Sequence, residues 1–115
     1  MTVIDLEVLK QLEIMLGEDS PDFFQELIAD FLSDADELMS QMQESVLQSS
    51  ATGLRNAAHT LKSNSAMFGA THFADLCKDL EYLGAAGSME GASSMFSHLQ
   101  EQFSLVRQEL EMAQV

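Results

Sequence analysis

Residues 59–70 of the 115-residue chain read HTLKSNSAMFGA. The stretch places His59 and Lys62 one helical turn apart among small side chains, and a glycine lies near its end. We predict that it forms the C-terminal half of a helix over about 51–68, with Gly69 at its C-terminal end, because glycine is common just past a helix. An imidazole beside an ammonium group suggests a site that handles a mobile phosphoryl group.

On such a helix, His59 points away from the core. At about 100° per residue, Ala66 lies within about 20° of it, and Arg55 and Ser63 lie within about 40°. Lys62 lies about 60° away. Isolated exposed histidines usually have no function, but here the neighbours are basic or short, and the predicted helix contains no acidic residue. The opposite side carries the expected core stripe, which consists of Leu54, Ala57, Leu61, Ser65 and Phe68.

The rest of the chain predicts an all-α protein. It has one proline and six glycines, and good helix formers such as Leu, Met, Ala, Glu and Gln dominate it. The predicted fold is a single domain over residues 1–115, an antiparallel up-down four-helix bundle with a short extra N-terminal helix. Apolar residues at helical spacing predict helices over residues 3–16, 21–48, 51–68, 71–86 and 89–113.

Several details of these helices follow from local sequence. Ser20 before Pro21 is the expected N-cap of the second helix. The run from Gly84 to Ser88 is expected to close the fourth helix. The first helix is predicted from apolar residues at spacings of three and four, which are Val3, Leu6, Leu9, Leu12 and Leu16.

Charge and composition narrow the choice of partners and compartment. A formal net charge of −14 disfavours nucleic acid and anionic membranes, so we expect basic protein surfaces or metal-loaded sites as partners. No apolar run approaches the roughly 20 residues of a membrane span, and no secretory signal is evident. The single cysteine, Cys77, excludes an intrachain disulfide and favours a reducing, cytoplasmic location.

The chain also lacks the motifs that bind ATP. It has neither a P-loop nor a kinase glycine-rich loop. Histidine titrates near neutral pH, so one ring nitrogen is available to attack phosphorus. We therefore expect a phosphoryl carrier without ATP-dependent kinase activity of its own.

The stretch from His59 to Ser65, followed by Gly69 and Ala70, resembles the pattern His-x-Leu-Lys-Gly-Ser/Ala-Ser/Ala with a later Gly-Ala. This is the pattern of the histidine-containing phosphotransfer (HPt) domain family of multistep phosphorelays in two-component signalling. Residues 4–9, 57–58 and 76–81 are also similar to the family, so the resemblance covers nearly the whole chain. Two positions depart from the pattern: Ser63 replaces the usual glycine, and Asn64 replaces a usual Ser or Ala.

The resemblance implies a function and a set of partners. His59 would accept a phosphoryl group from a receiver-domain aspartate and pass it to another receiver aspartate. Lys62 would stabilise the phosphoryl oxygens, and Gly69 would help to end the helix. No intrinsic cofactor is implied, and magnesium would be held by the partner receiver. The implied partners are response-regulator receivers and a sensor or hybrid histidine kinase, with the chain itself monomeric.

The residues leave some alternatives open. The chain could instead be a non-phosphorylated helical adaptor that docks on receivers or kinases. His72 and His98 are expected to be structural or surface residues rather than metal ligands, and Cys77 a small core hydrophobe. Met1 and full family coverage favour a free-standing protein over an excised domain. The residues expected to contact a partner are Arg55, Ser63, Ala66 and Met67, with Met39 as a further candidate.

Overall fold

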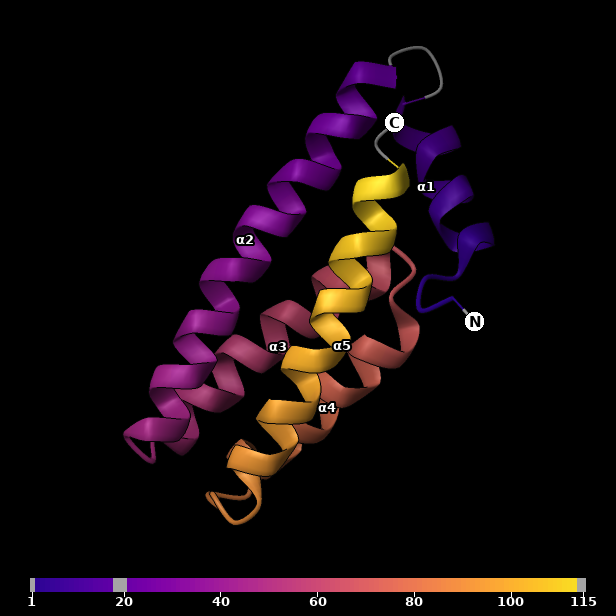
Figure 1. Ribbon diagram of the computed structural model, residues 1–115. Helices are drawn as coiled ribbons and strands as arrows, with labels where there is room; N and C mark the ends of the chain where they lie inside the picture. The colour runs from indigo at the N-terminus through magenta and orange to yellow at the C-terminus, as the bar shows by residue number, and fades with distance from the viewer. Residues whose placement is uncertain (1, 18–20, 114–115) are drawn as a thin grey trace.

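The computed structural model describes residues 2–17 and 21–113, and within them it contains five α-helices and no strand (Figure 1). The all-α prediction is therefore confirmed, whereas the predicted cap Ser20 lies outside the described residues. No helix in the described part of the chain is long and apolar enough to cross a membrane. The helices are α1 (Leu6–Gly17), α2 (Pro21–Leu47), α3 (Ala51–Met67), α4 (Thr71–Ala85) and α5 (Ala92–Ala113).

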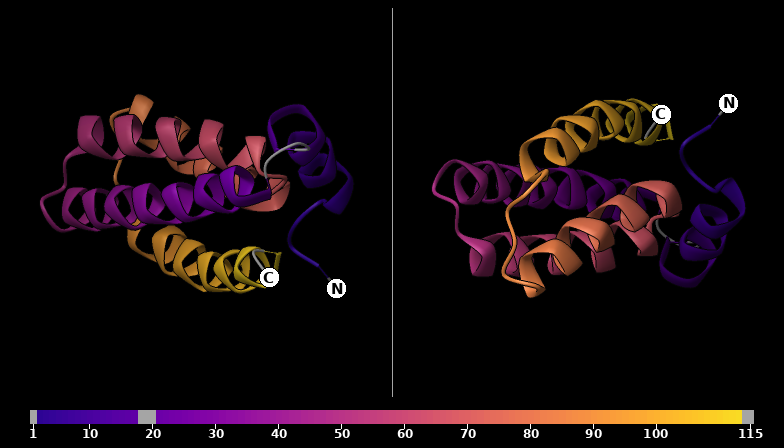
Figure 2. Two further views of the ribbon diagram at one scale, coloured as in Figure 1. Left: turned by 90° about the horizontal axis from the view of Figure 1, so that it is seen from above. Right: turned by 90° about the horizontal axis from the view of Figure 1, so that it is seen from below.

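Helices α2 to α5 form the bundle, and α1 lies across one end of it. Helix α3 contacts both α2 and α4, and α5 contacts α4 and α2, so the four helices close around a shared core. Helix α1 contacts α2 and α3, and both views of Figure 2 show it at one end of the long axis. The molecule is elongated, with principal extents of 46 × 25 × 18 Å.

The predicted core stripe of α3 is confirmed. Its four apolar members are all buried, and the Phe68 ring stacks on Phe31 of α2 with a centroid separation of 4.7 Å. Ser65 is fully buried as well, and its hydroxyl has no hydrogen-bond partner among the described residues. Because this stripe faces the core, the other side of α3 is left for solvent and partners.

The first helix differs from its prediction. It begins at Leu6 rather than at residue 3, because Asp5 Oδ1 caps it by accepting hydrogen bonds from two backbone N–H groups, of Glu7 at 3.1 Å and Val8 at 3.3 Å. Of the apolar positions that predicted this helix, Leu6 and Leu16 are 62% and 44% exposed. The helix meets only the end of the bundle, and a narrow ridge containing Leu9 and Leu12 suffices to cover it.

Of two other predicted boundaries, the start of α5 shifts and the end of α3 is confirmed. Helix α5 begins at Ala92, three residues later than expected, after Gly91 with a φ of +80°. Gly69 ends α3 as predicted: its φ is +84°, and the following Ala70 N–H donates to the Ser65 carbonyl at 3.0 Å. The Gly69 carbonyl then accepts from the Asp5 N–H at 2.7 Å, which ties the N-terminal segment to the end of α3.

Helix α4 ends at Ala85, within the run from Gly84 to Ser88 that was predicted to close it, and Gly84 itself lies in its last turn. An added Cβ at this position would lie 2.6 Å from the Ala51 carbonyl oxygen and 2.8 Å from the Arg55 nitrogen. Both atoms belong to the backbone of α3 and cannot turn aside. The absence of a side chain at Gly84 therefore allows α3 and α4 to pack with their backbones in contact.

We predict that Gly84→Ala destabilises the protein by about 1–2 kcal/mol. Because the added Cβ meets backbone atoms, we expect an overpacking cost of about 2–3 kcal/mol, in the upper part of the usual range, and the helix-propensity gain from replacing glycine by alanine offsets about 1 kcal/mol of it. The measurement is the free energy of unfolding from urea titration followed by circular dichroism.

Gly53→Ala is the matched control, because Gly53 is also helical. The atom nearest to its added Cβ is the Ser45 hydroxyl oxygen, which can rotate away. Equal destabilisation by the two substitutions would contradict the close α3–α4 contact as the cause.

Candidate functional site

The structure places His59 on the solvent-facing side of α3, as the helical geometry predicted. Its side chain is 60% exposed, and that of Lys62 is 28% exposed. The other residues expected on this face, Arg55, Ser63 and Ala66, are exposed as well. The face therefore offers an accessible imidazole flanked by two cationic side chains and two short ones.

A carboxylate from the neighbouring helix joins this face. Glu81 of α4 reaches across to α3, where its Oε2 lies 2.7 Å from His59 Nδ1 and its Oε1 accepts a hydrogen bond from Lys62 Nζ at 2.7 Å. The Glu81 side chain is only 13% exposed, so the bridge lies partly beneath the surface. One carboxylate thus holds both residues that the sequence singled out.

Sequence reasoning missed Glu81 as a member of the site. Helix α3 contains no acidic residue, as its sequence shows. The carboxylate that contacts His59 comes instead from α4. The available signal was its position: Glu81 directly follows buried Leu80 and lies one turn before Gly84.

The bridge alters the acidity of Glu81. The hydrogen bond from Lys62 is the main cause that holds the pKa of the Glu81 carboxyl below its ordinary value of 4.5. Partial burial raises this pKa, but the hydrogen bond with His59 and the charges of both basic partners lower it further. Glu81 is therefore an anion at neutral pH and acts as a hydrogen-bond acceptor toward the ring.

An ionised carboxylate at Nδ1 fixes the chemistry of the imidazole. A carboxylate can only accept hydrogen bonds, so the ring nitrogen at 2.7 Å carries the proton and donates it. In the neutral ring the lone pair then resides on Nε2, for which the described part of the chain provides no hydrogen-bond partner. The arrangement presents Nε2 as the nucleophile.

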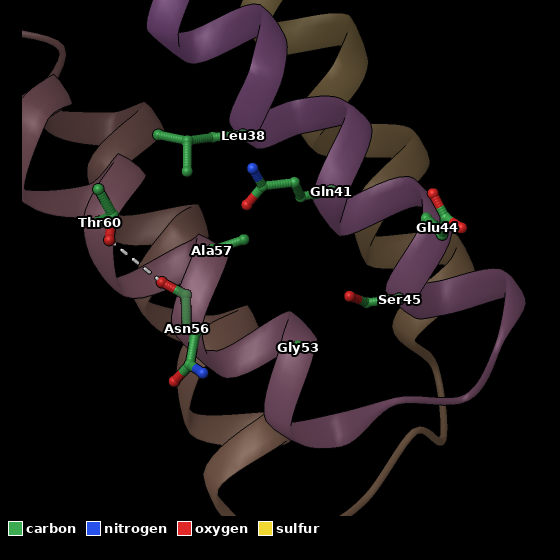
Figure 3. Close-up of a pocket in the computed structure, with 8 residues that line it drawn as sticks. All are labelled: Leu38, Gln41, Glu44, Ser45, Gly53, Asn56, Ala57 and Thr60. Atoms are coloured by element: carbon green, nitrogen blue, oxygen red, sulfur yellow. Dashed lines mark hydrogen bonds between the residues drawn. The ribbon is translucent and has the colours of Figure 1, made fainter.

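A shallow hollow of about 350 Å³ lies beside the ring, lined by Arg55, Asn56, His59, Thr60 and Glu81. A second groove of about 450 Å³ runs between α2 and α3 and shares Asn56 and Thr60 with the first. Figure 3 shows that Gln41 and Ser45 point from α2 into this groove, opposite Gly53 and Ala57 of α3. Its floor is open because the α3 side chains there are small.

Ser63 and Asn64, the two departures from the family pattern, have distinct places. The Ser63 hydroxyl donates to the His59 carbonyl at 3.3 Å, so it is turned toward the helix backbone. Asn64 lines a third hollow, of about 190 Å³, together with residues of α1, α2 and α3 that include Leu16, Leu27 and Met67. The Ser63 side chain therefore does not project over the imidazole ring, and Asn64 lines the 190 Å³ hollow rather than the one beside the ring.

The remaining candidates lie apart from this face or are buried. Burial raises the pKa of the Cys77 thiol to about 12, which excludes it as a nucleophile at neutral pH. His72 is exposed, and His98 Nδ1 lies 3.9 Å from a Glu101 carboxylate oxygen on the surface. Met39 is only 8% exposed, so its expected role in a partner surface is wrong, whereas Met67 is 55% exposed. The described residues contain no group of three or more potential metal ligands.

Comparisons with known proteins agree with this geometry. The family model of the Hpt domain matches residues 26–109 of the chain, so the protein belongs to the Hpt domain family. Comparison with curated proteins gives no significant match. Membership of this family makes the protein a phosphorelay intermediate.

Solved structures show the same fold. Histidine-containing phosphotransfer protein B from Pseudomonas aeruginosa is 25% identical with a TM-score of 0.89, over 96% of this chain and 93% of that one. The Saccharomyces cerevisiae phosphotransfer protein Ypd1, crystallised with the receiver domain of its downstream response regulator Ssk1, is 22% identical with a TM-score of 0.86, over 97% and 94%. A putative histidine-containing phosphotransfer protein from rice is 22% identical with a TM-score of 0.84, over 97% and 79%.

We predict that Glu81 titrates below 4.5 in the folded protein. A lowered folded pKa means that the carboxylate contributes stability above its ordinary pKa and loses it as the pH falls through the folded value. The measurement is the carboxyl ¹³C shift of Glu81 against pH, together with the unfolding free energy of the wild type and Glu81→Gln. The exposed Glu90→Gln serves as control, and a Glu81 midpoint at or above 4.5 would contradict the bridge.

Proposed function

We propose that His59 is the residue that carries the phosphoryl group in this phosphorelay intermediate. The observation that carries the proposal is the bridge by Glu81, which assigns the proton to Nδ1 and leaves Nε2 free on an exposed face. Histidine is a nucleophile when one ring nitrogen is unprotonated, and a neighbouring carboxylate fixes which one.

The transfer step balances without a further proton donor. The Nε2 lone pair attacks phosphorus of an aspartyl phosphate, the P–N bond forms, and the P–O bond to the aspartate breaks, which releases that carboxylate as an anion. The ring keeps its Nδ1 proton and becomes cationic, and the Glu81 carboxylate stabilises this charge through the hydrogen bond. In the reverse direction the ring leaves as a neutral imidazole, so the same geometry serves acceptance and release.

The donor and acceptor in this proposal are aspartates of response-regulator receiver domains. The yeast relative crystallised with a receiver domain supports this class of partner. The proposal assigns magnesium to the receiver, the first phosphorylation to a sensor or hybrid histidine kinase, and the process to the cytoplasm, with the chain acting as a monomer. A receiver active site that holds a divalent cation also suits a chain with a net charge of −14.

The surface between His59 and Met67 is the proposed receiver contact. Ser63 and Ala66 are exposed and short, so a partner can approach the α3 backbone closely. Beyond them, exposed Met67 lines the 190 Å³ hollow with Leu16, whose side chain is 44% exposed. Arg55 bounds the surface on the other side of the ring. Apolar contact near a polar rim is typical of specific protein interfaces.

The test is phosphoryl transfer from a panel of receiver domains labelled on their aspartates. The wild type is expected to gain an acid-labile, base-stable label, and His59→Gln is expected to gain none. Label on neither protein, with receiver binding intact, would instead support the alternative of a non-phosphorylated adaptor. Label on His59→Gln would place the phosphoryl group on another residue, and His72→Gln and His98→Gln are the matched controls.

We further predict that Lys62→Ala lowers the rate of transfer to His59 by about tenfold, or ~1.4 kcal/mol in barrier height. Lys62 neutralises Glu81 in the bridge, and its removal leaves an unpaired carboxylate beside the incoming dianionic phosphoryl group. The measurement is the single-turnover rate from a labelled receiver, with circular dichroism to confirm that the fold is intact.

The double variant Lys62→Ala/Glu81→Gln separates two roles for Lys62. If Lys62 acts by neutralising Glu81, removal of both charges restores much of the rate, since the glutamine carbonyl oxygen can still accept a hydrogen bond from Nδ1–H. If Lys62 binds the phosphoryl group directly, the double variant is as slow as Lys62→Ala. A wild-type rate in Lys62→Ala would remove Lys62 from the mechanism.

A further inference from the structure

The cations of this acidic chain gather around His59. Of its five basic residues, Arg55, Lys62 and Lys78 lie on α3 and α4. Lys62 is held by Glu81 at 2.7 Å, and Lys78 lies over the Tyr82 ring, 5.8 Å from its centroid. Within the described part of the chain, Arg55 has no ion-pair partner. The cation next to His59 whose charge is uncompensated is therefore Arg55, and not Lys62.

Helix geometry directs the ring toward the turn that contains Arg55. Arg55 precedes His59 by four residues, so the two lie on the same face of α3. Helical side chains lean toward the N-terminus of their helix, which tilts His59 over the preceding turn. Both residues line the same 350 Å³ hollow. A group attached to Nε2 enters a space that the Arg55 guanidinium borders.

The backbone of Arg55 is fixed by the contact with α4. An added Cβ at Gly84 would lie 2.8 Å from the Arg55 nitrogen and 3.0 Å from its Cβ, so this part of α3 packs directly on α4. The side chain beyond the Cβ is exposed and free to turn toward the hollow. The neighbouring groove between α2 and α3 contains Glu44 and no cation, so it offers a phosphoryl group no comparable partner (Figure 3).

We infer that Arg55 binds the phosphoryl oxygens of phosphorylated His59 through its guanidinium, while Lys62 remains paired with Glu81. The inference rests on the proposed function. It adds Arg55 to His59 as a residue that contacts the carried phosphoryl group. A planar guanidinium donates two parallel hydrogen bonds to phosphate oxygens, which a lysine ammonium cannot do. Arg55 thus stabilises the phosphorylated state itself, and not only the docking of a receiver.

The transfer equilibrium distinguishes these two roles. The ratio of phosphorylated chain to phosphorylated receiver at equilibrium depends only on the free proteins, so a contact made solely in the complex cannot change it. We measure this ratio with a labelled receiver for the wild type, Arg55→Gln and Arg55→Lys. Lys78→Gln is the matched control, because it removes one positive charge from an exposed position on the adjacent helix α4 that does not line the hollow.

Arg55→Gln is expected to lower the equilibrium constant for phosphorylation of His59 by about tenfold. Arg55→Lys is expected to recover part of this loss, and Lys78→Gln to leave the constant within about twofold of the wild type. A slower transfer with an unchanged equilibrium constant would overturn the inference and make Arg55 a receiver contact. An equal loss in Lys78→Gln would also overturn it, as a general charge effect. Absence of label on the wild type would defeat the proposed function itself, and this inference with it.

Discussion

The close approach of α3 and α4 at Gly84 is the constraint on which the site depends. Gly84 lies one turn after Glu81, and Arg55, which it contacts, lies one turn before His59. Because the two helices run in opposite directions, this single contact sets Glu81 opposite His59. A hydrogen bond weakens steeply beyond about 3.2 Å, so a side chain at Gly84 that separated the helices would move the carboxylate out of reach of Nδ1. Helix packing in the bundle thereby determines which ring nitrogen of the exposed His59 carries the proton.

The Glu81 bridge also resolves an electrostatic conflict. A chain with a net charge of −14 repels a phosphoryl group, and a carboxylate next to His59 would add to this repulsion. Lys62 on the other oxygen of Glu81 makes the pair neutral, so the carboxylate orients the ring without presenting a net charge. Partial burial strengthens this neutralisation of Glu81 by Lys62, because the attraction between fully exposed charges is screened by water and salt.

The sequence was sufficient to predict features that depend on one helix at a time. The all-α fold, the outward direction of His59, the burial of the Leu54–Phe68 stripe and the role of Gly69 all follow from periodicity and backbone preference. It was insufficient where two helices meet. Glu81 and Gly84 acquire their roles only from the register between α3 and α4, which no single-helix pattern encodes. The exposure of Leu6 and Leu16 also depends on how helices meet, because α1 rests on the end of the bundle and only part of its apolar face is covered.

The exposure of His59 is consistent with a carrier rather than a complete active site. Its side chain is 60% exposed, so the chain alone does not exclude water from the imidazole, and under the proposed function the groups that complete the transition state belong to the partner. What the chain contributes is a ring whose proton stays on Nδ1 in both directions of transfer. In the proposed mechanism no proton is gained or lost between acceptance and release, so the direction of transfer depends on the relative stabilities of phosphohistidine and the two aspartyl phosphates. Any residue that touches the carried phosphoryl group therefore tunes the direction of the relay, whereas a residue that touches only the receiver tunes its speed.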